Sequence, residues 1–338
     1  MDDARQHGID GPLNILVTTG GVSAEREVSL MSGEAVAAAL ETRGHRVRLA
    51  DIHPPHLEAL DDPAVDVVFI AMHGAFGEDG GMQQCCQDRG VPYVGSGPHA
   101  SELAMDKAAS KQVFRKGGLD TPDWVLVEAF DDAPRQTQWL RAPGLPCVLK
   151  PVDGGSSVDI VIAGTAARRA EALGDLLDKY SRALVERFVP GREFTVGVLG
   201  RRALPVMEIR VRRDFYDYTA KYEDDATEFI LDHGLDDDTV GALMNAALTA
   251  HRVLGCRDMS RTDFRVDANG RLWALETNTI PGFTTHSLLP KAAAAAGIDF
   301  PALCDRLVRM TLERQGVADE ELSPAPSWSS SGRSRSCG

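Results

Sequence analysis

The N-terminal part of the chain alternates between strand-like and helix-like segments, and this order constrains the fold more than any other feature. The apolar run 14–19 predicts a buried strand, and a glycine-rich turn follows at 20–27. Helical periodicity covers 28–44 and ends at a glycine, after which a second strand is predicted at 46–52. A strand, a connecting helix and a second strand in this order usually pair in parallel. The sequence therefore predicts a parallel α/β domain at the start, continued by strands at 65–72 and 91–96.

A predicted β-hairpin near the other end of the chain gathers polar side chains. The Asn-Gly dipeptide at 269–270 is typical of a two-residue turn between antiparallel strands. Residues two positions apart in a strand point to the same side. Arg261 and Asp263 therefore share one face of their strand, and Glu276 and Asn278 share one face of theirs. The hairpin would bring these four together, and Mg²⁺ prefers such oxygen ligands. The alternative for Glu276 and Asn278 is an edge strand with solvated polar residues.

A glycine loop at 150–159, KPVDGGSSVD, lies between two predicted strands. Gly154 and Gly155 permit close backbone approach, and exposed N–H groups in such a loop bind anions. Lys150 at the strand end and Lys107 in a predicted helix supply positive charge. The sequence contains no GxxxxGK[ST] motif, so this is not a P-loop. A plain flexible hairpin and a solvated helix lysine are the alternatives.

Two further pairs of residues each allow two interpretations from the sequence. Glu186 and Glu193 flank a Pro-Gly turn; they are either surface charges or, beside a nucleotide, acceptors for the adenine amino group and the ribose hydroxyls. Ser23 is a predicted helix N-cap with Glu25 in the first turn, where a carboxylate is favourable. Glu25 and His73 also follow strands of the predicted parallel sheet, at the edge where such sheets bind ligands. Structural roles for both are the alternative.

Composition excludes several classes of protein. The net charge of −14 argues against a general nucleic-acid binder. The six cysteines show no CxxC pair or zinc spacing, which predicts reduced thiols in a cytoplasmic protein. The polar, acidic N-terminus is unlike a signal peptide, and no apolar run is long enough to span a membrane.

The predicted elements divide the chain into domains. We expect an N-terminal α/β substrate-binding domain at 1–104 and two α+β regions at 105–190 and 191–318, the latter carrying the metal site. The segment 319–338 is rich in serine, glycine and proline, and we expect it to be a disordered tail.

Taken in order, the motifs of residues 13–315 resemble the D-alanine–D-alanine ligase family of the ATP-grasp superfamily. The resemblance rests on GGVSAEREVSLMSG, MHGAFGEDGGMQ, YVGSGPHASELAMDK, LKPVDGGSSV, VERFVPGREFTVGVLG, FYDYTAKY, SRTDF and LETNTIPGFTTHSLLP. It implies an α/β protein in which an N-terminal parallel-sheet (pre-ATP-grasp) domain precedes a two-part ATP-grasp α+β domain.

The resemblance implies that ATP binds between the two ATP-grasp parts as a co-substrate. The implied nucleotide-binding residues are Lys107, Lys150, Gly155, Ser156, Ser157, Glu186, Phe188, Val189, Glu193, Phe215 and Lys221. Asp263, Glu276 and Asn278 would hold two Mg²⁺ ions, for which Mn²⁺ can substitute.

The resemblance also implies the reaction, an ATP-dependent, ADP-forming ligation of two D-alanines through a D-alanyl phosphate, supplying peptidoglycan synthesis. The implied substrate-binding residues are Glu25, His73, Arg261, Gly282, Ser287 and Leu288. The implied catalytic residues are Glu25, Ser156, Tyr222, Arg261, Gly282 and Ser287. A homodimer with neither nucleic acid nor membrane as partner is expected. Tyr222 favours the dipeptide over a D-alanine–D-lactate product.

The chain departs from the family pattern at three places. Asp159 stands where the family usually has glycine, Gly154 where many members have a larger residue, and 257–263 differs from the usual glycine- and tryptophan-bearing version. An extra acid near a triphosphate should weaken ATP binding unless it is paired or turned away. The competing hypotheses are another ATP-grasp carboxylate–amine ligase, a non-catalytic ATP-binding regulator and a Rossmann oxidoreductase. The sequence contains no GxGxxG motif, which argues against the Rossmann oxidoreductase.

Overall fold

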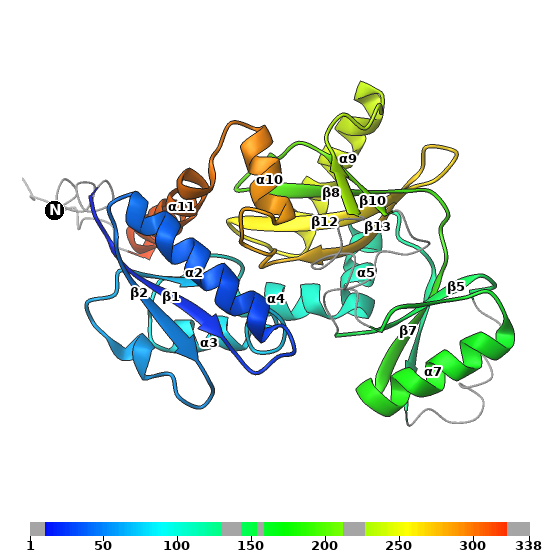
Figure 1. Cartoon of the computed structure of the whole chain (residues 1–338), viewed down its shortest axis with the longest axis horizontal. Helices are drawn as coiled ribbons and strands as arrows, with labels where there is room; N and C mark the ends of the chain where they lie inside the picture. Colours follow the sequence, from blue (N-terminus) through cyan, green and yellow to red (C-terminus); the bar gives the residue numbers. More distant parts are fainter. Residues whose placement is uncertain (1–10, 130–142, 154–158, 212–226, 323–338) are drawn as a thin grey trace, which may run out of the picture.

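The protein is built from three β-sheets with helices packed on them, shown together in Figure 1. This computed structural model describes residues 11–129, 143–153, 159–211 and 227–322. The mixed α/β class matches the expected one. Among the described residues, no helix is long and apolar enough to cross a membrane.

The first sheet is parallel, as the opening of the sequence predicted. Strand β1 (Asn14–Gly20) lies between β2 (Arg46–Ile52) and β3 (Val67–Ile70). Helix α2 (Arg26–Thr42) connects β1 to β2 and packs on the sheet. The predicted strand at 91–96 is reduced to a single parallel bridge between Val68 and Tyr93. The short helical elements of this part are η1 (Glu58–Asp61), α3 (Gly81–Asp88) and α4 (Pro98–Met105).

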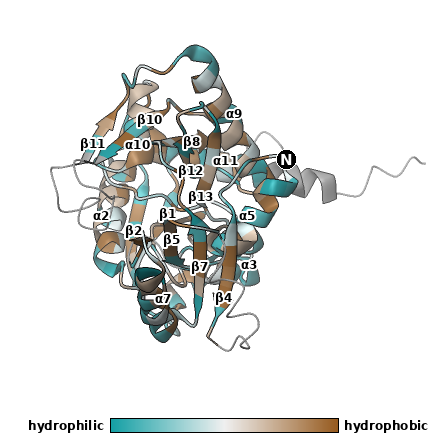
Figure 2. Ribbon diagram, turned by 90° about the vertical axis from the view of Figure 1, so that its right-hand side faces the viewer, coloured by the Kyte–Doolittle hydropathy of each residue, from teal (hydrophilic) through white to brown (hydrophobic). Residues whose placement is uncertain are grey.

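The second sheet is antiparallel and four-stranded, in the order β4-β7-β5-β6. Its strands are β4 (Trp124–Glu128), β5 (Cys147–Pro151), β6 (Val161–Ala163) and β7 (Arg182–Arg187). Helix α7 (Ala166–Tyr180) covers it, and Figure 2 shows both hydrophobic and hydrophilic residues on this helix. Helix α5 (Lys107–Lys116) precedes the sheet and contacts the third sheet.

The third sheet has six strands, with the order β11-β10-β8-β12-β13 and β9 paired to β8. The strands are β8 (Arg192–Leu199), β9 (Arg202–Ala203), β10 (Met207–Val211), β11 (Thr227–Ile230), β12 (Met259–Val266) and β13 (Leu272–Asn278). Helices α9 (Asp237–Val253) and α10 (Leu288–Ala295) pack on this sheet, whereas α11 (Phe300–Leu322) packs on α2 and β3 of the first sheet.

Two expectations differ from the structure. The β12–β13 hairpin forms, but 267–271 connects its strands, so the predicted two-residue turn is wrong. Asp267 accepts from the Asn269 and Arg271 N–H groups at 2.9 and 3.1 Å and stabilises this longer loop. Helix α11 continues to Leu322, so 319–322 are helical where a disordered tail was expected. The rest of that segment, 323–338, lies outside the described residues.

The first and third sheets share a hydrophobic core. One buried cluster joins residues of β1 and β3 to residues of β8, α10 and α11. Phe69 of β3 and Phe283 meet edge to face, with ring centroids 5.4 Å apart. Asp258 is buried at the same junction, where its carboxylate accepts from the Gly95 N–H at 2.8 Å and pairs with Arg314. These contacts fix the N-terminal sheet against the end of β13.

Candidate active site

The β12–β13 pairing brings the predicted metal-binding side chains together. The register places Arg261 opposite Asn278 and Asp263 opposite Glu276, which confirms their expected proximity. A register shift follows at once, between Asp263 and Phe264. Because of this bulge, the adjacent residues Leu275 and Glu276 both line one pocket, although neighbours in a regular strand point to opposite sides.

Asp263 is held by two neighbours on the same sheet. Its Oδ1 accepts a hydrogen bond from Thr195 Oγ1 at 2.6 Å and from Arg261 Nε at 3.1 Å. Its Oδ2 accepts from Arg261 Nη2 at 3.1 Å. All three side chains are buried, so the Asp263 carboxylate has a fixed orientation. Thr195 was not expected here; its place opposite Asp263 in the β8–β12 register explains its role.

The other two predicted ligands have their own contacts. Glu276 Oε2 lies 3.5 Å from Lys107 Nζ, which supports the grouping of that lysine with the metal ligands. Asn278 Oδ1 accepts from the Ile280 N–H at 2.9 Å. Within the described part of the chain, no three or more His, Cys, Asp or Glu side chains form a metal-binding group. Two carboxylates and an amide nevertheless fit Mg²⁺, which commonly takes one or two carboxylates and completes its shell with phosphate oxygens and water.

Glu186 lies fully buried between two lysines. Its Oε2 is 2.6 Å from Lys111 Nζ and 3.2 Å from Lys150 Nζ. Burial opposes ionisation of Glu186, but the two lysines outweigh it and lower its pKa. Burial lowers the pKa of Lys111 to about 8. Sequence reasoning missed Lys111, although it follows Lys107 by four residues and so lies on the same helix face.

A pocket between the second and third sheets is lined by several of these residues, among them Glu186, Asp263 and Glu276. Its lining is partly apolar and partly charged, and consists of Pro122, Val148, Lys150, Ile160, Ile162, Glu186, Arg187, Phe188, Val189, Glu193, Asp263, Arg265, Leu275 and Glu276. Such a mixture of apolar walls and a few convergent polar groups is typical of a small-molecule site. The expected nucleotide residues Glu186, Phe188, Val189 and Glu193 all lie in this lining. The Phe188 N–H points elsewhere, because it donates to the Pro146 carbonyl at 3.4 Å.

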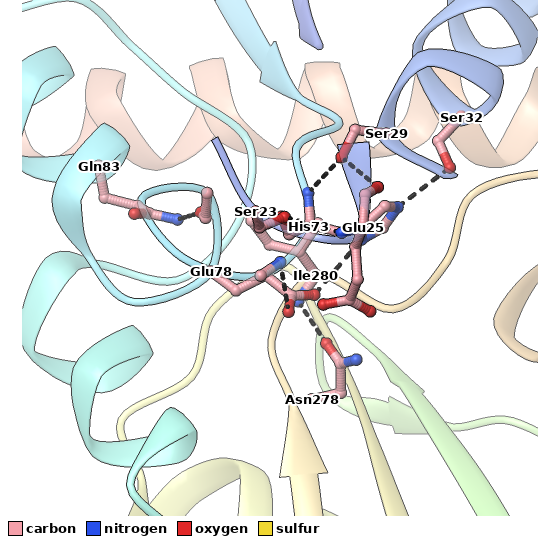
Figure 3. A network of polar contacts seen from close by, with 11 residues as sticks. Ser23, Glu25, Ser29, Ser32, His73, Glu78, Gln83, Asn278 and Ile280 are labelled. Carbon is pink, nitrogen blue, oxygen red and sulfur yellow. Dashed lines mark hydrogen bonds and ion pairs between the residues drawn. The ribbon is translucent and has the colours of Figure 1, made fainter. Parts of the chain in front are cut away.

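A polar network surrounds Glu25 and His73 at the carboxyl edge of the first sheet (Figure 3). The buried His73 ring contacts Ser32 Oγ at 3.0 Å through Nε2 and Glu78 Oε1 at 3.4 Å through Nδ1. Ser23 Oγ donates to the His73 carbonyl at 2.7 Å and accepts from the Glu25 N–H at 3.1 Å. The N-cap of α2 is Glu25 rather than Ser23, so that expectation is wrong by two residues.

Figure 3 also shows that this network faces the end of β13. The Glu25 carboxylate and the Asn278 amide point into the same space from different sheets. Glu78, which sequence reasoning also missed, holds the loop after β3 by accepting from the Gly74 N–H at 3.1 Å. The first sheet therefore presents a carboxylate to the end of β13, beside Asn278.

The segment after β13 brings the remaining predicted substrate residues together. An added Cβ on Gly282 would lie 3.0 Å from Ser287 Oγ, so the two residues are neighbours. Ser287 Oγ also contacts Thr284 Oγ1 at 3.0 Å and accepts from the Thr284 N–H at 3.1 Å. Ser287 is the N-cap of α10 and Leu288 its first residue. The positive end of a helix with a nearby hydroxyl favours a carboxylate ligand.

Six of the predicted residues cannot be located in this way. Those outside the described residues are Gly155, Ser156, Ser157, Phe215, Lys221 and Tyr222. The neighbouring departure Asp159 is described and has φ +58°, a conformation that favours glycine. Its carboxylate accepts from Tyr180 Oη at 2.6 Å and from Lys179 Nζ at 3.1 Å. The extra acid is thus paired with α7, which answers the concern that it would repel a triphosphate.

The fold and these clusters define a class of protein. A parallel α/β domain precedes two antiparallel sheets, and the pocket between the latter is lined by one lysine, two arginines and four carboxylates. This is the arrangement of an ATP-grasp enzyme.

Comparison with known proteins identifies the family within that class. The family model described as D-ala D-ala ligase C-terminus matches residues 113–309, and that of the D-ala D-ala ligase N-terminus matches 55–96. The D-alanine--D-alanine ligase of Gloeobacter violaceus is 44% identical over 302 residues, which are 89% of this chain and 100% of that protein. The corresponding protein of Chromohalobacter salexigens is 43% identical, over 91% of this chain and 95% of that protein.

Solved structures agree. A Bacillus anthracis D-alanine--D-alanine ligase complexed with ATP matches with a TM-score of 0.77 at 30% identity, covering 91% of this chain and 99% of that one. The Coxiella burnetii ligase matches with a TM-score of 0.79 at 26% identity, over 92% and 97%. The chain belongs to the D-alanine–D-alanine ligase family, which confirms the resemblance found in its motifs.

Proposed function

We propose that this protein is a D-alanine–D-alanine ligase that uses ATP and supplies peptidoglycan synthesis. The observation that carries the proposal is that polar groups from all three sheets meet along the end of β13. The first sheet presents Glu25, the second presents Lys150 and Glu186, and the third presents Asp263, Glu276 and Asn278. An amide ligase needs these functions together: an ammonium-binding carboxylate, a nucleotide pocket and a metal-binding set.

We propose that ATP lies in the pocket between the second and third sheets. Glu186 accepts from the adenine amino group, while Phe188 and Val189 contact the base and Glu193 binds the ribose hydroxyls. Lys107 and Lys150 bind the phosphates in this proposal, because Lys150 lines the pocket and Lys107 Nζ lies 3.5 Å from the pocket residue Glu276. Gly155, Ser156, Ser157, Phe215 and Lys221 complete the nucleotide site in this proposal.

We propose that Asp263, Glu276 and Asn278 hold two Mg²⁺ ions, or Mn²⁺ in their place. When bound there, the metal would supply positive charge beside the phosphates. The buried hydrogen bonds to Asp263 orient this ligand beforehand.

In the proposed reaction the carboxylate of the first D-alanine attacks the γ-phosphorus, and ADP leaves. The amine of the second D-alanine, having lost a proton, attacks the carbonyl carbon of the acyl phosphate. Arg261 and the Gly282 N–H stabilise the developing oxyanion, and inorganic phosphate leaves. Glu25 binds the first ammonium group, with His73 beside it. Ser287 and Leu288 bind the second carboxylate at the start of α10, and Ser156 and Tyr222 join Glu25 in positioning the substrates.

Three finer points belong to the same proposal. Tyr222 makes the amine, rather than D-lactate, the preferred second substrate. The proposed location is the cytoplasm, where ATP is available and cysteines stay reduced. It assembles as a homodimer through the first sheet and its helices.

The test is an assay with purified protein, D-alanine, ATP and Mg²⁺, following phosphate release and dipeptide by mass spectrometry. We expect D-alanyl-D-alanine, no product from L-alanine, and less ester than dipeptide when D-lactate is added. Glu276→Ala should abolish the product, whereas Glu58→Ala, at an exposed glutamate remote from the pocket, should not. ATP binding without any condensed product would refute the proposal and indicate a different substrate pair or a regulator.

A further inference from the structure

Arg265 is a charged residue of the nucleotide pocket to which the proposed function gives no task. It lies in β12, two residues after Asp263, and therefore on the same face of the strand. The β8–β12 register places it opposite Glu193, and both residues line the pocket. Arg265 Nη2 is 2.9 Å from Glu193 Oε2, and their side chains are 22% and 15% exposed.

The other arm of the Arg265 guanidinium is anchored to the main chain. Nη1 donates to the Gly191 carbonyl at 2.8 Å. Gly191 has φ +148°, and an added Cβ would lie 2.2 Å from the Val266 carbonyl oxygen, so this turn packs tightly against the end of β12. A planar guanidinium bonded at both arms has little freedom. Arg265 consequently holds the Glu193 carboxylate in one orientation.

That orientation matters for recognition of the sugar. A carboxylate has about four acceptor positions, and the ion pair with Arg265 leaves others for further hydroxyl donors. Two adjacent hydroxyls of a ribose can both be bound only if the carboxylate does not rotate. A hydrogen bond to a charged group changes an affinity by about tenfold or more when its geometry is kept.

We propose that Arg265 is a positioning residue that fixes Glu193 for the ribose hydroxyls and so determines the preference for ribonucleotides over deoxyribonucleotides. The inference rests on the proposed placement of ATP in this pocket. It adds a residue and a selectivity that the proposed function does not contain.

The experiment compares ATP with 2′-deoxy-ATP and 3′-deoxy-ATP in the dipeptide assay. For Arg265→Met we expect kcat/KM with ATP to fall about tenfold, mainly through KM, and the preference over at least one deoxy analogue to fall by a similar factor. Arg265→Lys should recover part of the preference, because a lysine replaces the charge but not the two-armed contact. As a control, Arg48→Met removes an arginine of β2 that pairs with Asp62, and it should leave the nucleotide preference unchanged.

A second readout separates this inference from the proposed reaction. Binding of ADP, 2′-deoxy-ADP and 3′-deoxy-ADP to the full-length protein is measured by calorimetry, which needs no ligation. If wild type binds ADP better than a deoxy analogue and Arg265→Met loses that difference, the inference holds even without dipeptide formation. If Arg265→Met binds or uses all three nucleotides with the wild-type preference, Arg265 does not position Glu193 for the sugar and the inference is wrong. Equal binding of all three by the wild type would also overturn it.

Discussion

Gly74 offers the sharpest test of how the first sheet presents Glu25. This residue has φ +71°, and an added Cβ would lie 2.8 Å from Ser23 Oγ and 2.9 Å from Glu25 Oε2. Non-bonded carbon contacts are most favourable near 3.5–4.0 Å. In Gly74→Ala, Ser23 and Glu25 would therefore have to move by about 0.5–1 Å. Because Ser23 bonds both the His73 carbonyl and the Glu25 N–H, the whole network would shift with it.

Two effects of Gly74→Ala can be estimated separately. A non-glycine residue in the left-handed region costs roughly 1–2 kcal/mol of folding free energy. A misplacement of about 1 Å at a reacting group can lower the rate by about a hundredfold, so a smaller shift of Glu25 is expected to lower kcat/KM for the first D-alanine by about tenfold or more. The KM for ATP should stay near the wild-type value, because the nucleotide pocket lies between other sheets.

Gly44→Ala is the matched control for backbone strain. Gly44 has φ +86°, and an added Cβ would meet nothing within 4 Å. Both variants should lose the stability that backbone strain costs, and Gly74→Ala should lose more in thermal unfolding because of its close contacts. Only Gly74→Ala should lose D-alanine kinetics in a phosphate-release assay. The reasoning fails if both variants keep wild-type kinetics, or if both lose activity equally, because backbone strain alone would then explain the outcome.

Two further outcomes concern buried charges. Among the described residues, Lys111→Met leaves the buried Glu186 with Lys150 as its one remaining cationic partner. We therefore expect unfolding to become easier by about 3 kcal/mol in urea denaturation and the KM for ATP to rise; an unchanged midpoint and KM would contradict this. Asp305 joins α11 to the first sheet through His45 at 2.8 Å, and burial opposes its ionisation, but His45 and neighbouring arginines outweigh burial and lower its pKa. A lowered carboxyl pKa stabilises the fold above the unfolded-state pKa near 4, and this stability is lost as pH falls further. Asp305→Asn should therefore lower the free energy of unfolding at pH 7, and lower it progressively less as pH falls below about 4. A loss of stability that does not change with pH would show that packing, and not the charge of Asp305, is responsible.

The sequence predicted the elements whose signals are local. The opening strands and helix have periodicities and end signals of their own, and β1, β2 and α2 lie close to the expected ranges. The hairpin was predicted because alternation and a turn signal coincide. The loop is longer than the Asn-Gly signal predicted, because the Asp267 side chain accepts from the Asn269 and Arg271 N–H groups and so forms a competing Asx-type turn. The segment 91–96 was overestimated as a strand. Its pairing with β3 consists of hydrogen bonds from Val68 to Pro92 and from Val94 to Val68, too few for a continuous ladder.

The site residues were predictable where they lie in one hairpin. They were not predictable where they come from elements that are distant in the sequence. Asp263 and Glu276 are cross-strand partners, so spacing alone brought them together. Lys111 and Glu186 come from a helix and a strand far apart in the chain, and their 2.6 Å contact depends on how α5 packs. The resemblance to a family located residues by motif, but it could not supply the partner of each one.

Those partners explain how an acidic protein can receive a polyanionic nucleotide. The chain has a net charge of −14, yet each pocket carboxylate lies beside a cation. The pairs are Glu186 with Lys111 and Lys150, Glu276 with Lys107, Asp263 with Arg261, and Glu193 with Arg265. Two unit charges 4 Å apart interact by about 4 kcal/mol at an effective dielectric constant of 20, enough to change an affinity by about a thousandfold. Removing one of these cations therefore weakens nucleotide binding twice, by losing an attraction and by leaving a carboxylate that repels the phosphates. This second effect predicts that losing a cation and its carboxylate together is less harmful to nucleotide binding than losing the cation alone.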